Sequence, residues 1–374
     1  MVEWKKLGEI CEVLDSQRKP VSKGNRRGGI YPYYGANGIQ DYVDSFIFDG
    51  TFLLLGEDGS VINKDKSPVL HWVSGKIWVN NHAHILKEIE KYSLRYIYYA
   101  LQCVDVSDIV RGVPPKINQA NMRNIQIPVP SLEEQNRIVG ILDTFTDSIE
   151  NLKQQIAQRR KQFEFYRDQL LDLEGKDEVE WKKLNTVCEV INGRAYKQQE
   201  LLAAGKYKVL RVGNFFSNDS WYFSDLELDD KYYCNVGDLL YAWSASFGPH
   251  IWTEEKTIYH YHIWKMNCSE ELDKKYMFYW LQSENMRKQA FSHLHGATMA
   301  HLTKALMESL NVPLLPLPEQ SRIVSILDTF EASISNLEAQ LEQRQKQYEY
   351  YRNQLLTFNE RRKRYVYTTI YSKF

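Results

Sequence analysis

EQNRIVGILDTFTDSIENLKQQIAQRRKQFEFYRDQLL, from Glu134 to Leu171, occurs a second time as EQSRIVSILDTFEASISNLEAQLEQRQKQYEYYRNQLL, from Glu319 to Leu356. The two copies are identical at about two thirds of their positions, contain no gap and lie 185 residues apart. A shorter repeat opens each half, as VEWKKLGEICEV from Val2 and VEWKKLNTVCEV from Val179. The chain is therefore two half-proteins in tandem, and the duplicated frame indicates one scaffold that holds two different recognition domains.

The long repeat has the pattern of a left-handed coiled coil, because its apolar residues recur at alternating spacings of four and three. Polar residues occupy most positions between them, as a solvated face requires. The predicted seam consists of Ile138, Leu142, Phe145, Ile149, Leu152 and Ile156 in the first copy and of Ile323, Leu327, Phe330, Ile334, Leu337 and Leu341 in the second. At ~1.5 Å per residue each helix is predicted to be roughly 57 Å long.

Both helices are predicted to begin after a proline-marked turn. PVPSLEEQ precedes the first, with Ser131 as N-cap and Glu134 at the capping-box spacing. PLLPLPEQ precedes the second, with Pro318 at or near the first helical position.

Two helices with the same seam most simply pair with each other inside one chain. An insert that returns near its own start permits antiparallel pairing with one insert at each end, which we prefer to a homodimer of parallel copies. Arg159 and Arg344 occupy equivalent seam positions. Either their stems pack while their heads reach solvent, or each guanidinium fixes the register by meeting a carboxylate across the seam, such as Glu338 or Glu331 for Arg159.

Composition and charge set broad limits on function. The chain has 374 residues, of which 43% are hydrophobic, and its formal net charge is -1. This charge argues against a generic polyanion binder, although local basic patches remain compatible with DNA binding. Five widely spaced cysteines without a CxxC pair argue against a disulfide framework or a zinc site and for a reducing compartment. Without a signal peptide or a membrane-length apolar run, we expect a cytoplasmic protein with no membrane contact.

The inserts read as α+β domains, with short aromatic-rich strands separated by Gly, Asn and Asp turns. SLRYIYYALQCV and KKYMFYWLQSENMRKQAFS are predicted to be helices; KVLRVGNFF and TIYHYHIWKM are predicted to be strands. We divide the chain into a recognition domain at 1–130, a coiled-coil helix at 131–173, a second recognition domain at 174–315 with a linker at 172–180, a second helix at 316–358 and a tail at 359–374.

Basic and amide side chains gather in loops of both inserts. Arg and Lys suit phosphates and guanine edges, and Asn and Gln suit adenine edges, so these loops are candidate DNA-binding segments. A solvated surface loop is the alternative for each. The first insert offers Arg18, Lys19, Lys23, Arg26 and Arg27, then Arg111, Lys116, Asn118, Gln119, Asn121 and Arg123. The second offers Arg194, Lys197, Gln198 and Gln199, then His293, His295, Thr298, His301 and Lys304.

Catalytic motifs are not evident in the sequence. It contains no GxGxxG after a strand, no phosphate loop and no HExxH. An adenine methyltransferase would be expected to show an Asn/Asp-Pro-Pro-aromatic motif, whereas the single Pro-Pro, at Pro114, follows Val113. His260 and His262 alternate as they would on one face of a strand, but no third ligand accompanies them, so we expect no metal site.

The whole arrangement resembles the specificity subunit of type I restriction–modification systems. The resemblance rests on the duplicated proline entry with EQxRIVxILDTF and on YYGANGIQDYVDSFIFDG, GDLLYAWSASFGP, RGVPPKINQANMRNIQIPVP and HGATMAHLTK. It implies two target-recognition domains that each read half of a bipartite, asymmetric site in double-stranded DNA. It also implies an antiparallel coiled coil that sets their spacing, and it adds Trp243 and Ser244 to the candidate contacts.

The same resemblance implies the partners and cofactors. Two modification subunits, which bind S-adenosylmethionine and methylate adenine, would dock on the helices, and restriction subunits that use ATP and Mg²⁺ would be further partners. No cofactor is expected on this chain. Two rival functions stay open at this point: a coiled-coil adaptor that binds only proteins, and a DNA-modifying enzyme in its own right. The loops do not reveal the DNA sequence recognised.

Overall fold

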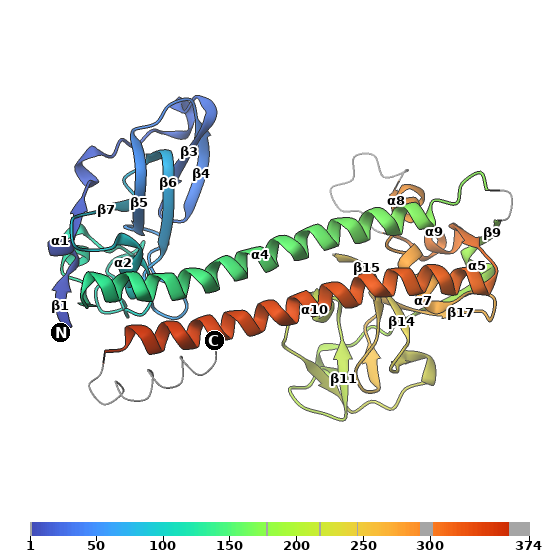
Figure 1. Ribbon diagram of the computed structural model, residues 1–374. Coiled ribbons are helices and arrows are strands. Elements are labelled where there is room, and N and C mark those ends of the chain that lie inside the picture. The colour runs from blue at the N-terminus through green and yellow to red at the C-terminus, as the bar shows by residue number, and fades with distance from the viewer. Residues whose placement is uncertain (1, 177–178, 217, 245, 292–301, 359–374) are drawn as a thin grey trace, which may run out of the picture. The chain divides into compact units, whose positions relative to one another are not determined.

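The computed structural model describes the chain except for residues 1, 177–178, 217, 245, 292–301 and 359–374 (Figure 1). Its secondary structure is mixed α+β, as predicted. The chain forms two compact units: the first comprises 1–153 and 339–374, and the second comprises 154–338. Each unit therefore combines one insert with part of both long helices.

The first unit is built around one mixed sheet. Its elements are β1 Glu3–Lys6, α1 Leu7–Ile10, β2 Cys11–Val13, η1 Asp15–Gln17, η2 Lys23–Asn25, β3 Gly28–Gly35, β4 Gly38–Val43, β5 Phe48–Gly56, β6 Leu70–Val79, β7 Ala83–Glu88, α2 Leu94–Leu101, α3 Gln119–Arg123 and β8 Gln126–Val129. The six-stranded sheet has the order β2-β7-β5-β6-β3-β4, and only β3 and β6 pair in parallel. β1 pairs with β8, so the two ends of the first insert meet, as antiparallel helix pairing requires.

The second unit divides its strands between two larger sheets. Its elements are β9 Glu180–Lys183, α5 Leu184–Val187, β10 Cys188–Asn192, η3 Gln198–Glu200, β11 Tyr207–Leu210, α6 Val212–Phe216, β12 Tyr222–Ser224, η4 Asp230–Tyr232, β13 Tyr233–Cys234, β14 Leu239–Ser244, β15 Ser246–Ile251, β16 Thr257–Tyr259, β17 Ile263–Cys268, α7 Lys274–Trp280, α8 Glu284–Phe291, α9 Lys304–Ser309 and β18 Asn311–Leu314. The larger sheets have the orders β10-β17-β14-β15 and β12-β11-β16-β13, and β9 pairs with β18.

The units thus share a frame and differ in what is added to it. The strands β2-β7-β5-β6 correspond in order to β10-β17-β14-β15, and the pair β1–β8 corresponds to β9–β18. The first unit extends its sheet with the β3–β4 hairpin, whereas the second places β11, β12, β13 and β16 in a sheet of their own. This divergence lies in the inserts, outside the repeated sequences.

The long helices are α4 Leu132–Leu171 and α10 Leu317–Leu356, each of 40 residues. The Ser131 hydroxyl accepts a hydrogen bond from the Glu134 amide at 3.4 Å, which confirms the predicted N-cap. α10 begins at Leu317, so Pro318 is its second residue, where a missing amide hydrogen costs no helical bond. None of the helices in the described ranges carries an apolar stretch long enough for a membrane span.

Within each unit the segments of α4 and α10 lie side by side and run antiparallel (Figure 1). In the first unit Phe145 stacks on Tyr351, with ring centroids 5.2 Å apart. In the second unit Tyr166 stacks on Phe330 at 5.4 Å. Phe330 is the repeat equivalent of Phe145, and Tyr351 that of Tyr166, so one contact occurs twice with the helices exchanged. The intrachain antiparallel arrangement is confirmed.

None of the predicted seam residues is exposed. Ile138, Leu142, Phe145, Ile156, Ile323 and Leu327 are buried, and Ile149, Leu152, Phe330, Ile334, Leu337 and Leu341 are half-buried. Residues between them are mostly exposed.

The seam arginines do not form the carboxylate lock that we considered. The Arg159 guanidinium lies over the Phe330 ring at 5.9 Å, and Arg344 lies over Phe145 at 5.6 Å. Glu338 instead accepts a hydrogen bond from the neighbouring Arg160 at 2.5 Å. The arginine heads therefore cover the aromatic stacks as cation–π partners.

Each insert is fastened to its long helix by the same polar anchor. The hydroxyl of Tyr99 in α2 donates to Asp143 in α4 at 2.5 Å, and the hydroxyl of Tyr279 in α7 donates to Asp328 in α10 at 2.6 Å. A buried glutamine at the start of each long helix completes the anchor. Gln135 accepts from the Ser93 amide at 2.9 Å, and Gln320 accepts from the Asp273 amide at 2.7 Å.

Three predicted elements of the second insert are wrong in detail. KKYMFYWLQSENMRKQAFS forms two helices, α7 and α8, because the Ser283 hydroxyl donates to the carbonyl of Trp280 and accepts from the amide of Met286, which starts a new helix. KVLRVGNFF leaves the strand after Leu210 and continues as α6. TIYHYHIWKM forms β16 and β17 joined at His260–His262, so these histidines lie in a turn rather than on one strand face.

Candidate nucleic-acid interface

A buried charge cluster lies under the candidate loops of the first unit. Asp15 follows β2, Glu57 follows β5 and His84 lies in β7, so the sheet brings together groups that are distant in sequence. His84 Nδ1 lies 2.6 Å from Asp15 Oδ2, and His84 Nε2 lies 2.8 Å from the Ile117 carbonyl oxygen. Both ring nitrogens of His84 therefore face oxygen atoms, one of a carboxylate and one of a backbone carbonyl.

Asp15 is held ionised in spite of its burial. Burial favours the neutral form and would raise the pKa of Asp15, but the bonds from His84, from the Gln119 side chain and from the Ile85 amide outweigh it. The pKa of Asp15 is therefore lowered from its ordinary value. The cluster is thus a paired, hydrogen-bonded set of charges, the form in which buried charges are tolerated.

This cluster fixes the segment 111–119. Lys116 Nζ lies 3.2 Å from Glu57 Oε1, the Ile117 amide donates to the Glu57 carbonyl at 2.8 Å, and Gln119 donates to Asp15 at 2.9 Å. Arg111 and Lys116 exchange backbone hydrogen bonds of 2.9 and 2.7 Å, which close the loop between them. The tip of the loop, at Val113, is fully exposed. The loop is therefore presented to solvent on a rigid base.

The two amide candidates after this loop begin and brace α3. Asn118 Oδ1 accepts from the Asn121 amide at 2.8 Å, as an N-cap does, and Asn121 Nδ2 donates to the Ile109 carbonyl at 3.1 Å. Asn118 and Gln119 are exposed and Asn121 is half-buried.

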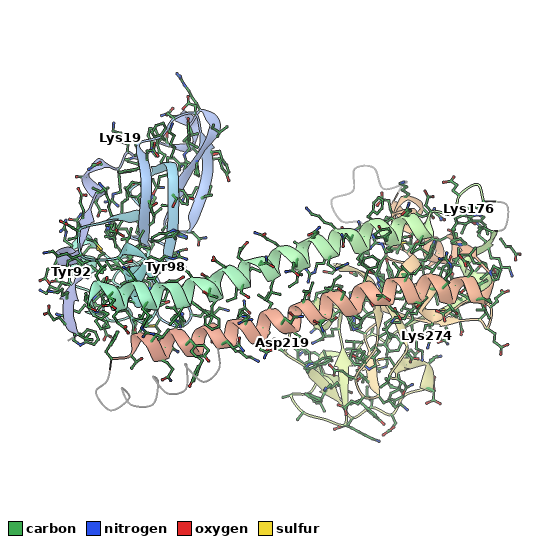
Figure 2. All side chains as sticks on the ribbon, in the orientation of Figure 1. Lys19, Tyr92, Tyr98, Lys176, Asp219 and Lys274 are labelled. Atoms are coloured by element: carbon green, nitrogen blue, oxygen red, sulfur yellow. The ribbon has the colours of Figure 1, made fainter. Side chains whose placement is uncertain are left out.

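The basic loop 16–29 supplies cations of two kinds. Arg18 donates to Glu57 at 2.5 Å and to the carbonyls of Asp15 and Ala83, so its guanidinium is directed into the protein. Arg26 likewise bonds the Val21 carbonyl and Asp41. The exposed basic side chains of this loop are those of Lys19, Lys23 and Arg27 (Lys19 is labelled in Figure 2). Within the described residues these three form no ion pair. The structure thus leaves these three cations available to a phosphate backbone.

The second unit brings its candidate residues to one turn. A Cβ on Gly193 would lie 2.4 Å from the His260 carbonyl oxygen, so only glycine permits the segment 192–194 to approach the turn at His260–His262. Arg194 binds Glu200 with two bonds of 2.9 and 2.8 Å, and these bonds, with the Lys197 amide, lower the pKa of Glu200 to about 2. Arg194 is therefore neutralised within the unit, whereas Lys197 and Gln198 are exposed beside it.

An aromatic cluster surrounds this turn, and Trp243 is the member of it that was expected to contact DNA. Trp243 donates through Nε1 to the Tyr261 carbonyl at 2.9 Å, and its ring lies 5.0 Å from that of His262. Burial, His262 and Arg211 lower the pKa of His260 to about 4, so this ring is neutral near pH 7. Arg211 itself lies 5.3 Å from the Tyr222 ring. The alternating YHYH of residues 259–262 was the signal in the sequence, and it was considered only for metal binding.

The other candidates of the second unit are dispersed. Ser244 pairs with Ser246 at the end of the β14–β15 hairpin. Lys304 is the first residue of α9 and lies 3.5 Å from Glu308. His293, His295, Thr298 and His301 fall outside the described residues, as does the tail at 359–374.

Among the described residues, one group has the composition of a metal site: Asp15, Glu57 and His84, whose ligand atoms lie within 4.8 Å of one another. The two carboxylates are already paired with cations, because Arg18 and Lys116 lie on Glu57 and Arg18 also lies 3.5 Å from Asp15. Two cations, Arg18 and Lys116, balance the two carboxylates and leave no net negative charge for a further cation. The group serves as a structural network and does not fit a metal ion.

The comparisons with known proteins agree with the duplicated frame. A family model described as the type I restriction modification DNA specificity domain matches residues 1–159 and again 176–345. The chain belongs to the specificity subunits of type I restriction–modification systems. It is 32% identical to the putative type I restriction enzyme specificity subunit S.HindORF215P of Haemophilus influenzae, over 96% of each chain. It is also 24% identical to the EcoR124I/EcoR124II specificity subunit of Escherichia coli, over 96% of this chain and 94% of that one.

Solved structures show the same fold. The S subunit of a type I system from M. genitalium has a TM-score of 0.62 at 14% identity, over 96% of this chain and 97% of that chain. A chain from a study of complex assembly in a type I system has a TM-score of 0.55 at 16% identity, over 96% and 98%. As a specificity subunit, the protein is the non-catalytic DNA specificity component of its system.

Proposed function

We propose that this specificity subunit reads a bipartite, asymmetric site in double-stranded DNA, one half with each unit, and directs two modification subunits to it. The observation that carries the proposal is the duplicated anchor, Tyr99–Asp143 in one unit and Tyr279–Asp328 in the other. Equivalent anchors on antiparallel helices hold two inserts in equivalent ways, while the inserts themselves differ. Such a molecule suits a site with two unlike halves in inverted orientation.

The two reading surfaces differ in chemistry. The first offers the cations Lys19, Lys23 and Arg27 and the rigid loop 111–116, which suit phosphate contacts and groove entry. The second offers Trp243 and the His260–His262 turn, a surface of aromatic faces and the neutral imidazole of His260. In this proposal the sequence information lies in these parts, and the repeated helices contribute the spacing between the half-sites.

Two grooves that share repeat-equivalent residues of α4 and α10 support two copies of one partner. A groove of about 590 Å³ in the first unit is lined by residues that include Asn136, Gly140 and Thr144. A groove of about 470 Å³ in the second is lined by residues that include their repeat equivalents Ser321, Ser325 and Thr329. In the proposed complex each groove receives one modification subunit, and these subunits carry S-adenosylmethionine and methylate adenine. Restriction subunits that use ATP and Mg²⁺ are further partners, and the complex acts in the cytoplasm, where the DNA is.

The docking proposal is tested by filling each groove. A Cβ on Gly140 meets no atom within 4 Å, so Gly140→Trp should block the first groove without disturbing the helix seam. Ser325→Trp is the matched variant in the second copy. Native mass spectrometry with the modification subunit should show two copies on the wild-type chain, one on each single variant and none on the double variant. Two copies on the double variant would refute these grooves as docking sites.

The reading function is tested by sequencing methylated adenines in a host that carries this chain and its modification partner. We expect a motif of two unlike blocks separated by a spacer of fixed length. Substitution of Lys19, Lys23 and Arg27 by Gln should weaken methylation at all sites, since phosphate contacts carry no sequence information directly. Trp243→Ala should change only one block. A contiguous motif, or a motif in which both blocks change with Trp243→Ala, would overturn the assignment of one half-site to each unit.

A further inference from the structure

Two cysteines of the second unit face each other across paired strands. Cys188 in β10 and Cys268 in β17 are direct partners in the antiparallel register, and their Sγ atoms lie 3.9 Å apart. The adjacent pair is joined by a hydrogen bond of 2.9 Å from the Ser269 amide to the Val187 carbonyl. Hydrogen-bonded and non-hydrogen-bonded pairs alternate along antiparallel strands, so Cys188 and Cys268 form a non-hydrogen-bonded pair.

That position brings side chains close enough for a covalent bond. Cα atoms in non-hydrogen-bonded pairs are ~4.5 Å apart, at the short end of the ~4.4–6.8 Å range that disulfides occupy. The sulfur atoms need to approach by roughly 2 Å to reach the ~2.05 Å bond length, which rotations about the two Cα–Cβ bonds can supply. No rearrangement of the strands is required.

The two thiols are also unequal in reactivity. Cys188 is buried, and the facing Cys268, together with burial, raises the pKa of its thiol. Cys268 is half-buried at the end of β17, where the facing Cys188 lowers the pKa of its thiol despite burial, and Lys274 contributes in the same direction. Cys268 is thus the thiol that ionises and meets an oxidant first, and Cys188 lies behind it as a resolving thiol.

We propose that Cys188 and Cys268 are a reversible oxidation site that closes to a disulfide in the second unit. With a peroxide as oxidant, the Cys268 thiolate attacks the O–O bond, becomes a sulfenic acid and releases one water. The Cys188 sulfur then attacks the Cys268 sulfur, forms the S–S bond and releases a second water. The two thiols lose two electrons and two protons, and the peroxide is reduced to two water molecules. A dithiol reductant reverses the reaction.

The first unit lacks this site although it has the same strand pair. Cys11 in β2 is the repeat equivalent of Cys188, and its partner in β7 is Glu88. The absence of a disulfide framework in the sequence is consistent with this proposal, since a labile pair stays reduced until an oxidant appears. The bond would join the two ends of the segment 189–267, which holds most of the strands of the second insert. Oxidation would therefore stiffen one insert and leave the other unchanged.

The test uses the full chain with Cys103→Ser, which removes the exposed cysteine that would otherwise link two chains. Treatment with hydrogen peroxide, quenching and unfolding should leave two free thiols of the remaining four, since the chain has five cysteines in all. Non-reducing peptide mapping should show Cys188 linked to Cys268, and dithiothreitol should restore both thiols. The oxidised chain should also show a higher thermal midpoint for the second unit.

Matched variants decide the outcome. Cys188→Ser in the same background should give sulfenic acid at Cys268 that a dimedone probe traps, with no intrachain link. Cys268→Ser should slow the loss of thiols to the rate of the buried Cys11 and Cys234. A peroxide-treated chain that keeps all four thiols, or one that forms sulfinic acid at Cys268 while Cys188 stays free, would overturn the proposal.

Discussion

The buried cluster of the first unit yields the sharpest prediction about stability. Asp15→Asn keeps the shape of the side chain and removes its charge, so Arg18 and His84 lose the carboxylate that lies 3.5 Å and 2.6 Å from them. His84 is fully buried and Asp15 is 7% exposed, so water cannot replace the lost charge. Breaking a buried pair of this kind costs about 3–5 kcal/mol. The free energy of unfolding of the first unit should fall by that amount.

Amide hydrogen exchange on the full chain can measure this loss unit by unit. A cost of about 3–5 kcal/mol corresponds to roughly 10²- to 10³-fold faster exchange or more, at amides such as those of Ile85 and Ile117, which depend on the cluster. The second unit serves as the internal reference, since its amides should be unaffected. Asp49→Asn is the matched control, because Asp49 is exposed on β5 and its loss should change stability by less than about 0.5 kcal/mol. If Asp15→Asn and Asp49→Asn gave the same exchange rates, the cluster would not hold the loop 111–119.

Three further predictions concern the frame and the second unit. Tyr99→Phe and Tyr279→Phe each remove one hydrogen bond to a carboxylate and should each lower the free energy of unfolding of their own unit by about 1.5–3 kcal/mol. In the double variant the two losses should add. Denaturation curves recorded with a probe in each unit measure this, and strong coupling between the two losses would contradict independent anchors. Folding of the second unit lowers the pKa of His260 from 6.5 to about 4. The contribution of neutral His260 to the stability of this unit should therefore be complete above pH 6.5 and decline as the pH falls towards 4. Tryptophan fluorescence should report this decline, and an unchanged pH profile in His260→Gln would show that His260 does not cause it. Glu88→Cys places a thiol opposite Cys11 at the equivalent strand pair of the first unit. Oxidation of this variant should give a second intrachain disulfide in peptide maps. Absence of that disulfide would show that strand geometry alone is insufficient to form one.

The sequence predicted the parts of the fold that are periodic or repeated. The spacing of Ile138, Leu142 and Phe145 predicted the helix and its buried side. The duplicated seam favoured pairing of the two helices, because the same pattern occurs twice in the chain. Breaks within regular patterns were not predictable from periodicity. Ser283 divides a helix through two hydrogen bonds of its own hydroxyl, and the YHYH segment turns where the backbone of Gly193 lies against it.

The candidate site was predictable by residue type but not by partner. Arg18 has the same sequence signature as Lys19, yet it faces Glu57, which lies 39 residues away in the chain and reaches it only through the pairing of strands. The arginine–aromatic stack at Phe330 was missed for the same reason, since the sequence offered only solvent or a carboxylate across the seam for Arg159. Pairings over long sequence distances decide which polar groups remain for a ligand, and a single sequence does not record them.

The composition of the units has a consequence for synthesis on the ribosome. The first unit contains the first insert, but its core also includes Leu355 and Leu356, and Tyr351 covers Phe145. These residues are translated only after the whole second insert, so the first insert emerges long before the segment that completes its core. Until then Phe145, on the apolar side of α4, lacks the Tyr351 ring that covers it. The nascent chain must therefore stay soluble with this surface open while the second half is made, and a premature stop before residue 339 would leave it open permanently.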